Sequence, residues 1–597
     1  MAMNKIPNLD HAQAICSSAS AGVQNKKNSV LPCSATLHIG FFFDGFGHNL
    51  EHDIQNDQTT NISRLFMVHP DVDLSDAADP FALHRRFYIS GIGTDFDTKL
   101  GGGTELSLTG LQGALNKAKD NVADVPKGSA TDAAVDAGKD ILTGKNWWEN
   151  LLNNLKPGNI ISTIVKAVAP AAIEIFPAIR DNEIAADLFK TGVDTRLEAA
   201  SQAFEDAITK AEAQSKAPIK RVAVSVFGFD FGATLARAFA HKLFEDCDPG
   251  TTRFKGKNLE IVFAGLFDAV DRSSESSIIG DFISPLTSKV DDGECLPGPV
   301  KAALHLVAAH ECRSTRRSRL IGTGSLTPRW EERLVPGTSY DVGGGLKKAD
   351  APYSLELHKA TLQDMYRAAY RAGVPFPEFE KLPDIGVKIS QLFELNDHVN
   401  GISAIESSKR YMAKVGHNQV SAESFLAHRC MYIRRLRSLW QLYNGQYRAY
   451  SDEEDRLERP IFGENGSLKK MLGLGRESEA QAKKRDHALK QVRTHKTALR
   501  NELGWLEAVD AEARRIRSGL STEAEKALLN EWFNPNPPAL NPDVEDLLEL
   551  YLNDSYMIGQ MPKEPMYLKY FLVRGLDRPD LTKTKGMAPD YLQQYMS

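Results

Sequence analysis

The sequence predicts an α/β fold in which a mostly parallel sheet is flanked by helices. Buried-strand patterns recur at 37–49, 87–97, 221–230 and 259–270, and the third runs directly into the helical stretch GATLARAFAHKLFED. Strands that alternate with helices in this way build a parallel sheet with helices on both faces. The chain has 597 residues, which is enough for two or three domains and a full-sized core.

The order of these patterns predicts four parts. Residues 1–30 form a polar, flexible N-terminal segment, and the sheet domain extends over 31–395. Within that domain, about 98–195 changes to Gly-rich, Ala-rich and then apolar sequence, which we interpret as a cap-like insertion over a pocket. Residues 396–597 are predicted to be mainly helical. One candidate helix there, 477–519, has apolar residues at helical spacing and is interpreted as a solvated amphipathic helix. The alternatives are that it docks on the sheet domain or serves a partner.

Charge, cysteine usage and motifs exclude several function classes. The formal net charge is −6 with both signs interspersed, so the chain lacks the basic stripe of nucleic-acid-binding proteins and we expect no such partner. Six scattered cysteines without a CxxC pair are typical of reduced thiols, not of a disulfide or zinc framework. No metal-binding, Walker or dinucleotide motif occurs, so we expect neither a metal nor a cofactor.

Membrane anchors and cleaved signals are not predicted. The N-terminal sequence MAMNKIPNLDHAQAICSSAS lacks the apolar core of a secretory signal. The most apolar stretch, 160–179, contains two charged residues and two prolines, which makes it a poor membrane-spanning helix. We therefore expect a protein that is cytoplasmic in the producing cell. Any delivery to a target cell would proceed without a signal peptide.

The segment VFGFDFGATLARAF carries the clearest chemical signal. A strand that ends in G-x-nucleophile-x-G and turns at once into a helix is the nucleophile elbow of α/β-hydrolases. Gly228 and Gly232 allow the strand and helix backbones to approach each other. Asp230 holds the nucleophile position, and the N–H of Phe231 lies at the positive end of the helix dipole, where an oxyanion would develop.

Seven segments resemble, in order, the type VI secretion phospholipase effectors of the first lipase class. The resemblance covers roughly 37–346 and implies an α/β-hydrolase fold with a Ser-His-Asp triad and phospholipase activity. The segments are FFFDGFGHN (41–49), TNISRLF (60–66), YISGIGT (88–94), GFDFGATLAR (228–237), GLFDAV (265–270), LVAAHECR (306–313) and VPGTSYDVGGG (335–345).

Two positions depart from this family pattern. Where the family has the catalytic serine this chain has Asp230, and where it has the histidine this chain has Ser339; the triad acid is retained as Asp268. Asp230 has no hydroxyl to activate, and the Ser339 alcohol cannot act as a base near neutral pH. A weaker C-terminal match, YLNDSY, also has Asn553 in place of a histidine. Loss of triad members removes several orders of magnitude of rate.

Other interpretations of these positions stay open at this stage. Asp230 could act as a nucleophile itself if His48, His305 or His310 approached it as a base, or it could simply cap the following helix. Gly45 and Phe46 are expected in the loop that would complete an oxyanion hole, with Asp44 as either its anchor or an Asx-turn residue.

The sequence therefore predicts a lipase-effector-like protein that acts by binding. The expected partners are a secretion spike, an immunity-type protein or a phospholipid membrane surface. The alternative is an active phospholipase or other ester hydrolase that uses an unorthodox site around Asp230 and Asp268.

Overall fold

The structure is a computed structural model, and it describes most but not all of the chain. The described residues are 34–71, 82–96, 100, 192–215, 217–270, 296–313, 316–322, 329–348, 351, 353–396, 398–399, 401–458, 479–519, 521–554 and 570–577. The predicted N-terminal segment 1–30 lies outside them, as does nearly all of the predicted insertion at 98–195.

A seven-stranded sheet forms the centre of the fold. Six strands follow the order β2-β1-β3-β5-β6-β8 and pair in parallel, and the short β4 pairs antiparallel with β5. The mostly parallel sheet predicted from the sequence is confirmed. Its strands are β1 (Ala35–Phe43), β2 (Ala82–Ile89), β3 (Ile219–Phe229), β4 (Arg253–Phe254), β5 (Lys257–Phe267), β6 (Ala303–Ala308) and β8 (Trp330–Val335).

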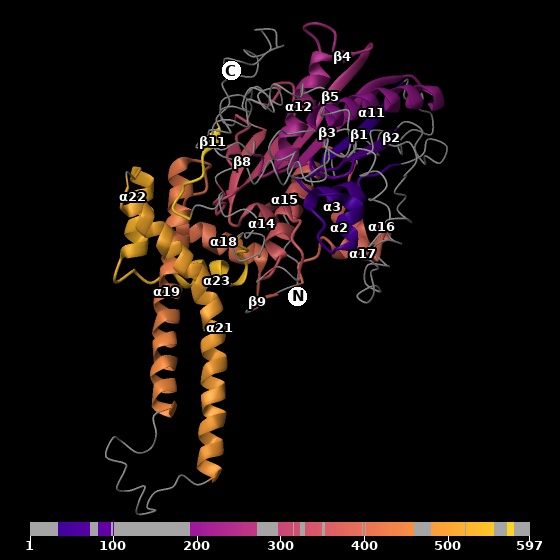
Figure 1. The fold of residues 1–597 in the computed structure, drawn as a ribbon. Helices are drawn as coiled ribbons and strands as arrows, with labels where there is room; N and C mark the ends of the chain where they lie inside the picture. Colours follow the sequence, from indigo (N-terminus) through magenta and orange to yellow (C-terminus); the bar gives the residue numbers. More distant parts are fainter. Residues whose placement is uncertain are drawn as a thin grey trace, which may run out of the picture.

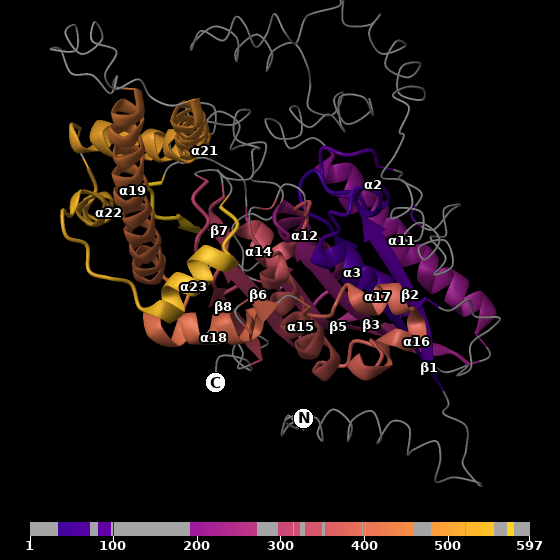
Figure 2. The same ribbon diagram turned by 90° about the horizontal axis from the view of Figure 1, so that it is seen from below.

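Helices cover both faces of this sheet, and alternation along β1 shows why. Phe41 and Phe43 point to one face, towards α11 (Val193–Gln214) and α12 (Phe231–Glu245). Phe42 points to the opposite face, where α3 and α15 pack. Successive side chains of a strand alternate between faces, so a run of three buried phenylalanines requires cover on both sides. Figure 2 shows α11 and α15 on opposite sides of the strands.

The other described elements before residue 404 connect the strands of the sheet or follow its last strand. They are α2 (Leu50–Gln55), α3 (Asn61–Val68), β7 (Ser318–Arg319), α14 (Ser339–Gly343), α15 (Glu356–Arg371), η1 (Phe379–Lys381), α16 (Leu382–Ile385), α17 (Val387–Gln391), β9 (His398–Val399) and β10 (Ile402–Ser403).

The described C-terminal part is mainly helical. Its elements are α18 (Ala404–Val415), α19 (Ala422–Glu458), α21 (Glu479–Arg517), α22 (Glu523–Phe533), α23 (Pro542–Leu550) and β11 (Leu576–Asp577), which pairs in parallel with β7. They share an apolar core that includes Ile433, Leu506 and Trp532.

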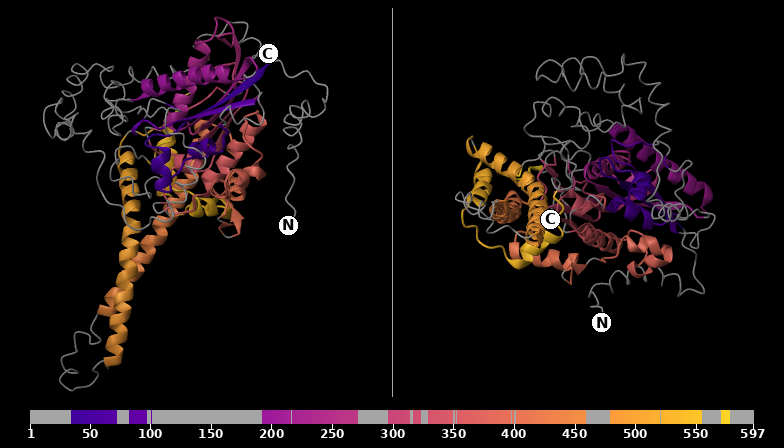
Figure 3. Two further views of the ribbon diagram at one scale, coloured as in Figure 1. Left: turned by 90° about the vertical axis from the view of Figure 1, so that its right-hand side faces the viewer. Right: turned by 60° about the horizontal axis from the view of Figure 1, so that its bottom comes forward.

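The two longest helices, α19 and α21, pack side by side as an arm that extends away from the sheet (Figures 1 and 3). The interpretation of 477–519 as a solvated helix is wrong in one respect. Its apolar side of Val492 and Leu503 is buried, and in this hairpin it is α19 that covers that side. Among the described residues, no helix is long and apolar enough to cross a membrane.

Candidate functional site

The turn between β3 and α12 has the strained geometry of an elbow. Asp230 adopts φ 53° and ψ −126°, a conformation that side-chain-bearing residues rarely adopt. A Cβ on Gly228 would lie 2.4 Å from the Cα of Ala233, and a Cβ on Gly232 would lie 2.1 Å from the carbonyl oxygen of Asp44. Both glycines are therefore required by close backbone contacts, as the sequence pattern predicts.

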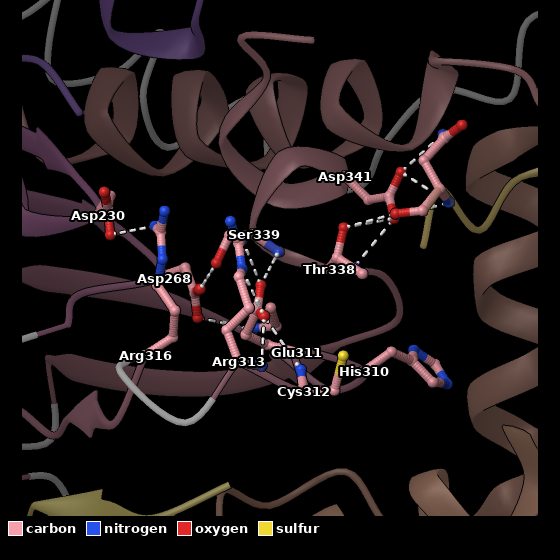
Figure 4. A network of polar contacts seen from close by, with 12 residues as sticks. Asp230, Asp268, His310, Glu311, Cys312, Arg313, Arg316, Thr338, Ser339 and Asp341 are labelled. Atoms are coloured by element: carbon pink, nitrogen blue, oxygen red, sulfur yellow. Dashed lines mark hydrogen bonds and ion pairs between the residues drawn. The ribbon is translucent and has the colours of Figure 1, made fainter. Parts of the chain in front are cut away.

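The carboxylate of Asp230 is buried and charge-paired. Its side chain is 2% exposed and accepts a hydrogen bond from Nη1 of Arg316, while the N–H of Phe46 lies 3.4 Å from Oδ2 (Figure 4). It makes no side-chain capping bond to α12, so the expected helix-capping role is not what the structure shows. The carboxylate interacts instead with Arg316 and with the loop after β1.

Asp268, at the end of β5, is the second buried acid of the site. It also has a positive φ, 46°, and is fully buried. Arg574 donates from Nη1 to Oδ1 at 2.6 Å and from Nη2 to Oδ2 at 3.1 Å, which is a fork-shaped pairing of guanidinium with carboxylate. The N–H of Ala308 also donates to Oδ1, at 2.9 Å, and the hydroxyl of Ser339 donates to Oδ2.

Ser339 lies beside Asp268, at the start of α14. Its backbone N–H is 3.3 Å from Oε2 of Glu311, and Glu311 pairs with Arg313 at 2.7 Å. Burial by itself raises the pKa of Glu311, but Arg313 and the nearby arginines outweigh it and hold that pKa well below its usual range. Glu311 is therefore a carboxylate that anchors this turn.

The loop after β1 is organised by Asp44. Its Oδ2 accepts hydrogen bonds from the hydroxyls of Tyr88 at 2.6 Å, Thr60 at 2.8 Å and Ser63 at 3.0 Å, and burial raises its pKa. Its Oδ1 accepts the N–H of Gly45 at 2.7 Å. The two expected oxyanion-hole donors of this loop thus differ: the Phe46 N–H points at Asp230, and the Gly45 N–H is taken up by Asp44.

Two of the three candidate histidines are engaged away from Asp230. His305 accepts the N–H of Ala269 at Nε2 and contacts Glu332 at 2.7 Å through Nδ1. His310 accepts the N–H of Gly337 and contacts the hydroxyl of Tyr411. Both rings are buried and serve packing, since all four of their nitrogens have partners inside the fold.

His48 differs, because its surroundings resemble those of a base. Its Nδ1 lies 2.9 Å from the buried Oδ2 of Asp53. Burial lowers the pKa of His48, but the carboxylates of Asp53, Asp44 and Asp230 outweigh that effect and raise it. Asp53 makes the largest of these carboxylate contributions to the pKa of His48, and Asp230 makes the smallest.

Asp341 and Asn553 form a separate structural pair. The carboxylate of Asp341 accepts the N–H of Thr338 at 2.9 Å and the side-chain amide of Asn553 at 2.9 Å. Asn553 is thus bound to the N-terminal turn of α14 through Asp341. Among the described residues, no group of three or more potential metal ligands comes together.

The sequence reasoning missed Arg316 and Arg574. Arg316 lies in a stretch with three other arginines, at 313, 317 and 319, and spacing alone gives no indication that one of them pairs with Asp230. Arg574 lies 306 positions from Asp268, and no local pattern links the two.

Comparisons with known proteins support the fold only. No family model and no curated protein matches the chain. The chain is similar to the crystal structure of an uncharacterized protein from Pseudomonas aeruginosa, with a TM-score of 0.52 and 16% identity over 95% of this chain and 82% of the other. A second structure, of the Tle1 effector bound to the VgrG spike of the type VI secretion system, gives a TM-score of 0.26 and 18% identity over 56% of each chain. At this sequence identity the first similarity indicates a shared fold alone. The TM-score of the second is too low to support a conclusion.

Proposed function

We propose that this chain is an α/β-hydrolase-like protein, related in its motifs to the type VI secretion lipase effectors, that acts by binding and not by serine-esterase catalysis. The partners proposed are a secretion spike, an immunity-type protein or a phospholipid surface. The observation that supports this most directly is the pairing of both triad-equivalent acids with arginines, Asp230 with Arg316 and Asp268 with Arg574.

The chemistry of these pairs argues against the triad mechanism. A triad needs a neutral histidine between nucleophile and acid, because the histidine takes the proton of the nucleophile while the acid orients the ring and stabilises the imidazolium that forms. Here Asp268 bonds to the permanently charged guanidinium of Arg574 and to the hydroxyl of Ser339, besides the backbone N–H of Ala308. Neither group can accept a proton near neutral pH, and Asp230 supplies negative charge where a substrate oxyanion would need positive charge.

Hydrolysis and binding can be tested on the same material. The parent protein and an Asp230→Ala variant are incubated with vesicles of phosphatidylcholine, phosphatidylethanolamine and phosphatidylglycerol. Released fatty acid and vesicle-bound protein are measured. Asp206→Ala, on the exposed side of α11, is the matched control. We expect no release above the blank from any of the three proteins. Release by the parent and by Asp206→Ala that disappears in Asp230→Ala would contradict the proposal.

A second candidate function is a hydrolase that uses Asp230 as the nucleophile. Its support is the contribution of Asp230 to the raised pKa of His48, together with the retained strain of the elbow. In such a reaction an oxygen of Asp230 would attack the acyl carbon of the ester and expel the alcohol, which takes a proton from His48, to leave an anhydride of Asp230 with the fatty acid. Water that gives a proton back to His48 would then hydrolyse this anhydride, releasing the fatty acid and restoring Asp230. This candidate predicts that His48→Gln abolishes the same fatty-acid release as Asp230→Ala.

A further inference from the structure

A short C-terminal segment closes the triad-equivalent site. Residues 570–577 run past the carboxyl ends of the strands, and β11 at their end pairs with β7 over two residues. The N–H of Ser318 donates to the carbonyl of Gly575 at 3.0 Å. Between these anchors, Arg574 turns inward and is 4% exposed.

The site provides a set of acceptors that matches a guanidinium group. Nη1 and Nη2 of Arg574 face the two oxygens of Asp268, Nη1 also lies 3.2 Å from the carbonyl of Ala308, and Nε donates to the carbonyl of Arg316. Four acceptors thus surround the three nitrogens of one planar cation. An ammonium group would reach fewer of these acceptors, because it is a compact point charge without the planar fork.

This one side chain links both acids of the site. It pairs directly with Asp268, and through the carbonyl of Arg316 it supports the residue whose own guanidinium pairs with Asp230. Ser339, which bonds to the same carboxylate as Arg574, is 1% exposed. Arg574 therefore contacts Asp268 directly, shares that carboxylate with Ser339, and is one residue removed from the pair of Asp230 with Arg316.

The segment meets the sheet region at several points among the described residues. Besides the ion pair of Arg574 there are the two-residue strand pairing, Gly575 beside the side chain of Arg317, and apolar packing of Val573 and Leu576 against a small cluster that includes residues of β6 and β8. The other end of the segment is attached to the helical part, where the Tyr570 carbonyl accepts Nη2 of Arg429 at 2.6 Å and the Tyr570 N–H meets Glu512. The buried ion pair is the contact at which the segment can detach, because desolvation offsets much of the ion-pair attraction.

We propose that residues 570–577 are a latch. In the closed state Arg574 occupies a guanidinium-binding cradle, which consists of Asp268 and the neighbouring carbonyl acceptors. In the open state Asp268, Asp230 and Ser339 are exposed. This inference rests on the proposed binding function in one respect, because the open site is the surface that would bind a ligand. The ligand class that the exposed cradle would accept is an arginine side chain or another planar guanidinium cation.

Thiol labelling measures whether the latch controls access. Ser339→Cys places a reporter thiol behind Arg574, and its rate of modification by a small maleimide is followed by peptide mass spectrometry. The rate is compared in three further backgrounds: Arg574→Ala, Arg574→Lys and Arg434→Ala. Arg434 is the matched control, because it forms an equally fork-shaped pair with Glu531 within the helical part. Cys247, buried in the sheet domain, reports unfolding in every sample.

We expect Arg574→Ala to raise the labelling rate of the introduced thiol at least tenfold, Arg574→Lys to raise it less, and Arg434→Ala to leave it unchanged. Cys247 should keep its parent rate throughout. An unchanged rate in Arg574→Ala would overturn the latch. If Cys247 also becomes reactive in that variant, Arg574→Gln, which retains hydrogen-bonding groups, decides by the same criterion. The result is independent of lipid hydrolysis, so the latch and the proposed function can fail separately.

Discussion

The guanidinium of Arg574 pairs through two hydrogen bonds with the carboxylate of Asp268, which lies 306 positions earlier in the sequence. Nη1 lies 2.6 Å from Oδ1 and Nη2 lies 3.1 Å from Oδ2, and both side chains are buried. The pair joins the C-terminal part of the chain to the end of a central strand. It also places a permanent cation beside Asp268, at the acid where a catalytic triad would have a histidine.

Removing the cation of this pair should destabilise the fold strongly. Arg574→Ala leaves Asp268 as a buried charge without its counter-ion, and losing one partner of such a pair costs about 3–5 kcal/mol. Urea unfolding monitored by circular dichroism measures the change. Adding Asp268→Asn to the same variant should recover part of the loss, since it removes the uncompensated charge. A loss below about 1 kcal/mol would show that solvent reaches the carboxylate.

The elbow glycines should not tolerate a methyl group. Gly232→Ala would place Cβ 2.1 Å from the carbonyl oxygen of Asp44, so the backbone must shift, and we expect a loss of about 3 kcal/mol. The control is Gly445→Ala on the exposed side of α19, where a Cβ meets nothing within 4 Å. That change should stabilise the protein by about 1 kcal/mol, because alanine favours helix. Equal thermal stability of the two variants would contradict the close approach at the elbow.

Buried histidines should make the fold sensitive to acid. Burial lowers the pKa of His428 to about 4, from 6.5 in the unfolded chain. Between these values the unfolded state holds a proton that the folded state lacks. This contribution to stability is therefore complete above pH 6.5 and is lost as the pH falls towards 4, by about 1.4 kcal/mol per pH unit. His428→Gln should reduce the slope of stability against pH by that amount, and His487→Gln, on the exposed face of α21, should not.

The helical arm should depend on its apolar contacts and hardly on its ion pairs. Leu503 is 2% exposed and in the arm's core, so Leu503→Ala should cost about 2–5 kcal/mol. Arg493 pairs with Glu454 at 2.8 Å, but its side chain is 54% exposed, so solvent screens the pair and Arg493→Ala should cost much less than Leu503→Ala. Urea unfolding of both variants compares the two effects. A larger loss from Arg493→Ala would mean that this ion pair is shielded from solvent.

The elements that the sequence predicted are those with strong local signals. Alternation of buried strands with helices predicted the parallel sheet, and the paired glycines around Asp230 predicted a strained turn between β3 and α12. These features follow from backbone sterics and from the period of apolar residues, both of which act over a few neighbouring positions.

The contacts that the sequence did not predict are made between residues that lie far apart in the sequence. Helical spacing identified α21, but only the fold shows that its apolar side packs against α19. The glycine motif placed Asp230 at the elbow, yet the capping role expected there is absent, since the strained backbone directs the carboxylate to Arg316 and the Phe46 N–H.

The sequence by itself determined the α/β fold, the elbow and the loss of serine and histidine at positions 230 and 339. Only the tertiary structure decided what replaced them, namely two arginines that neutralise Asp230 and Asp268. The physical reason is the distance along the sequence over which each kind of interaction acts. Steric and periodic signals are local in the sequence, whereas a buried charge takes its partner from whichever distant segment the fold brings within hydrogen-bonding distance.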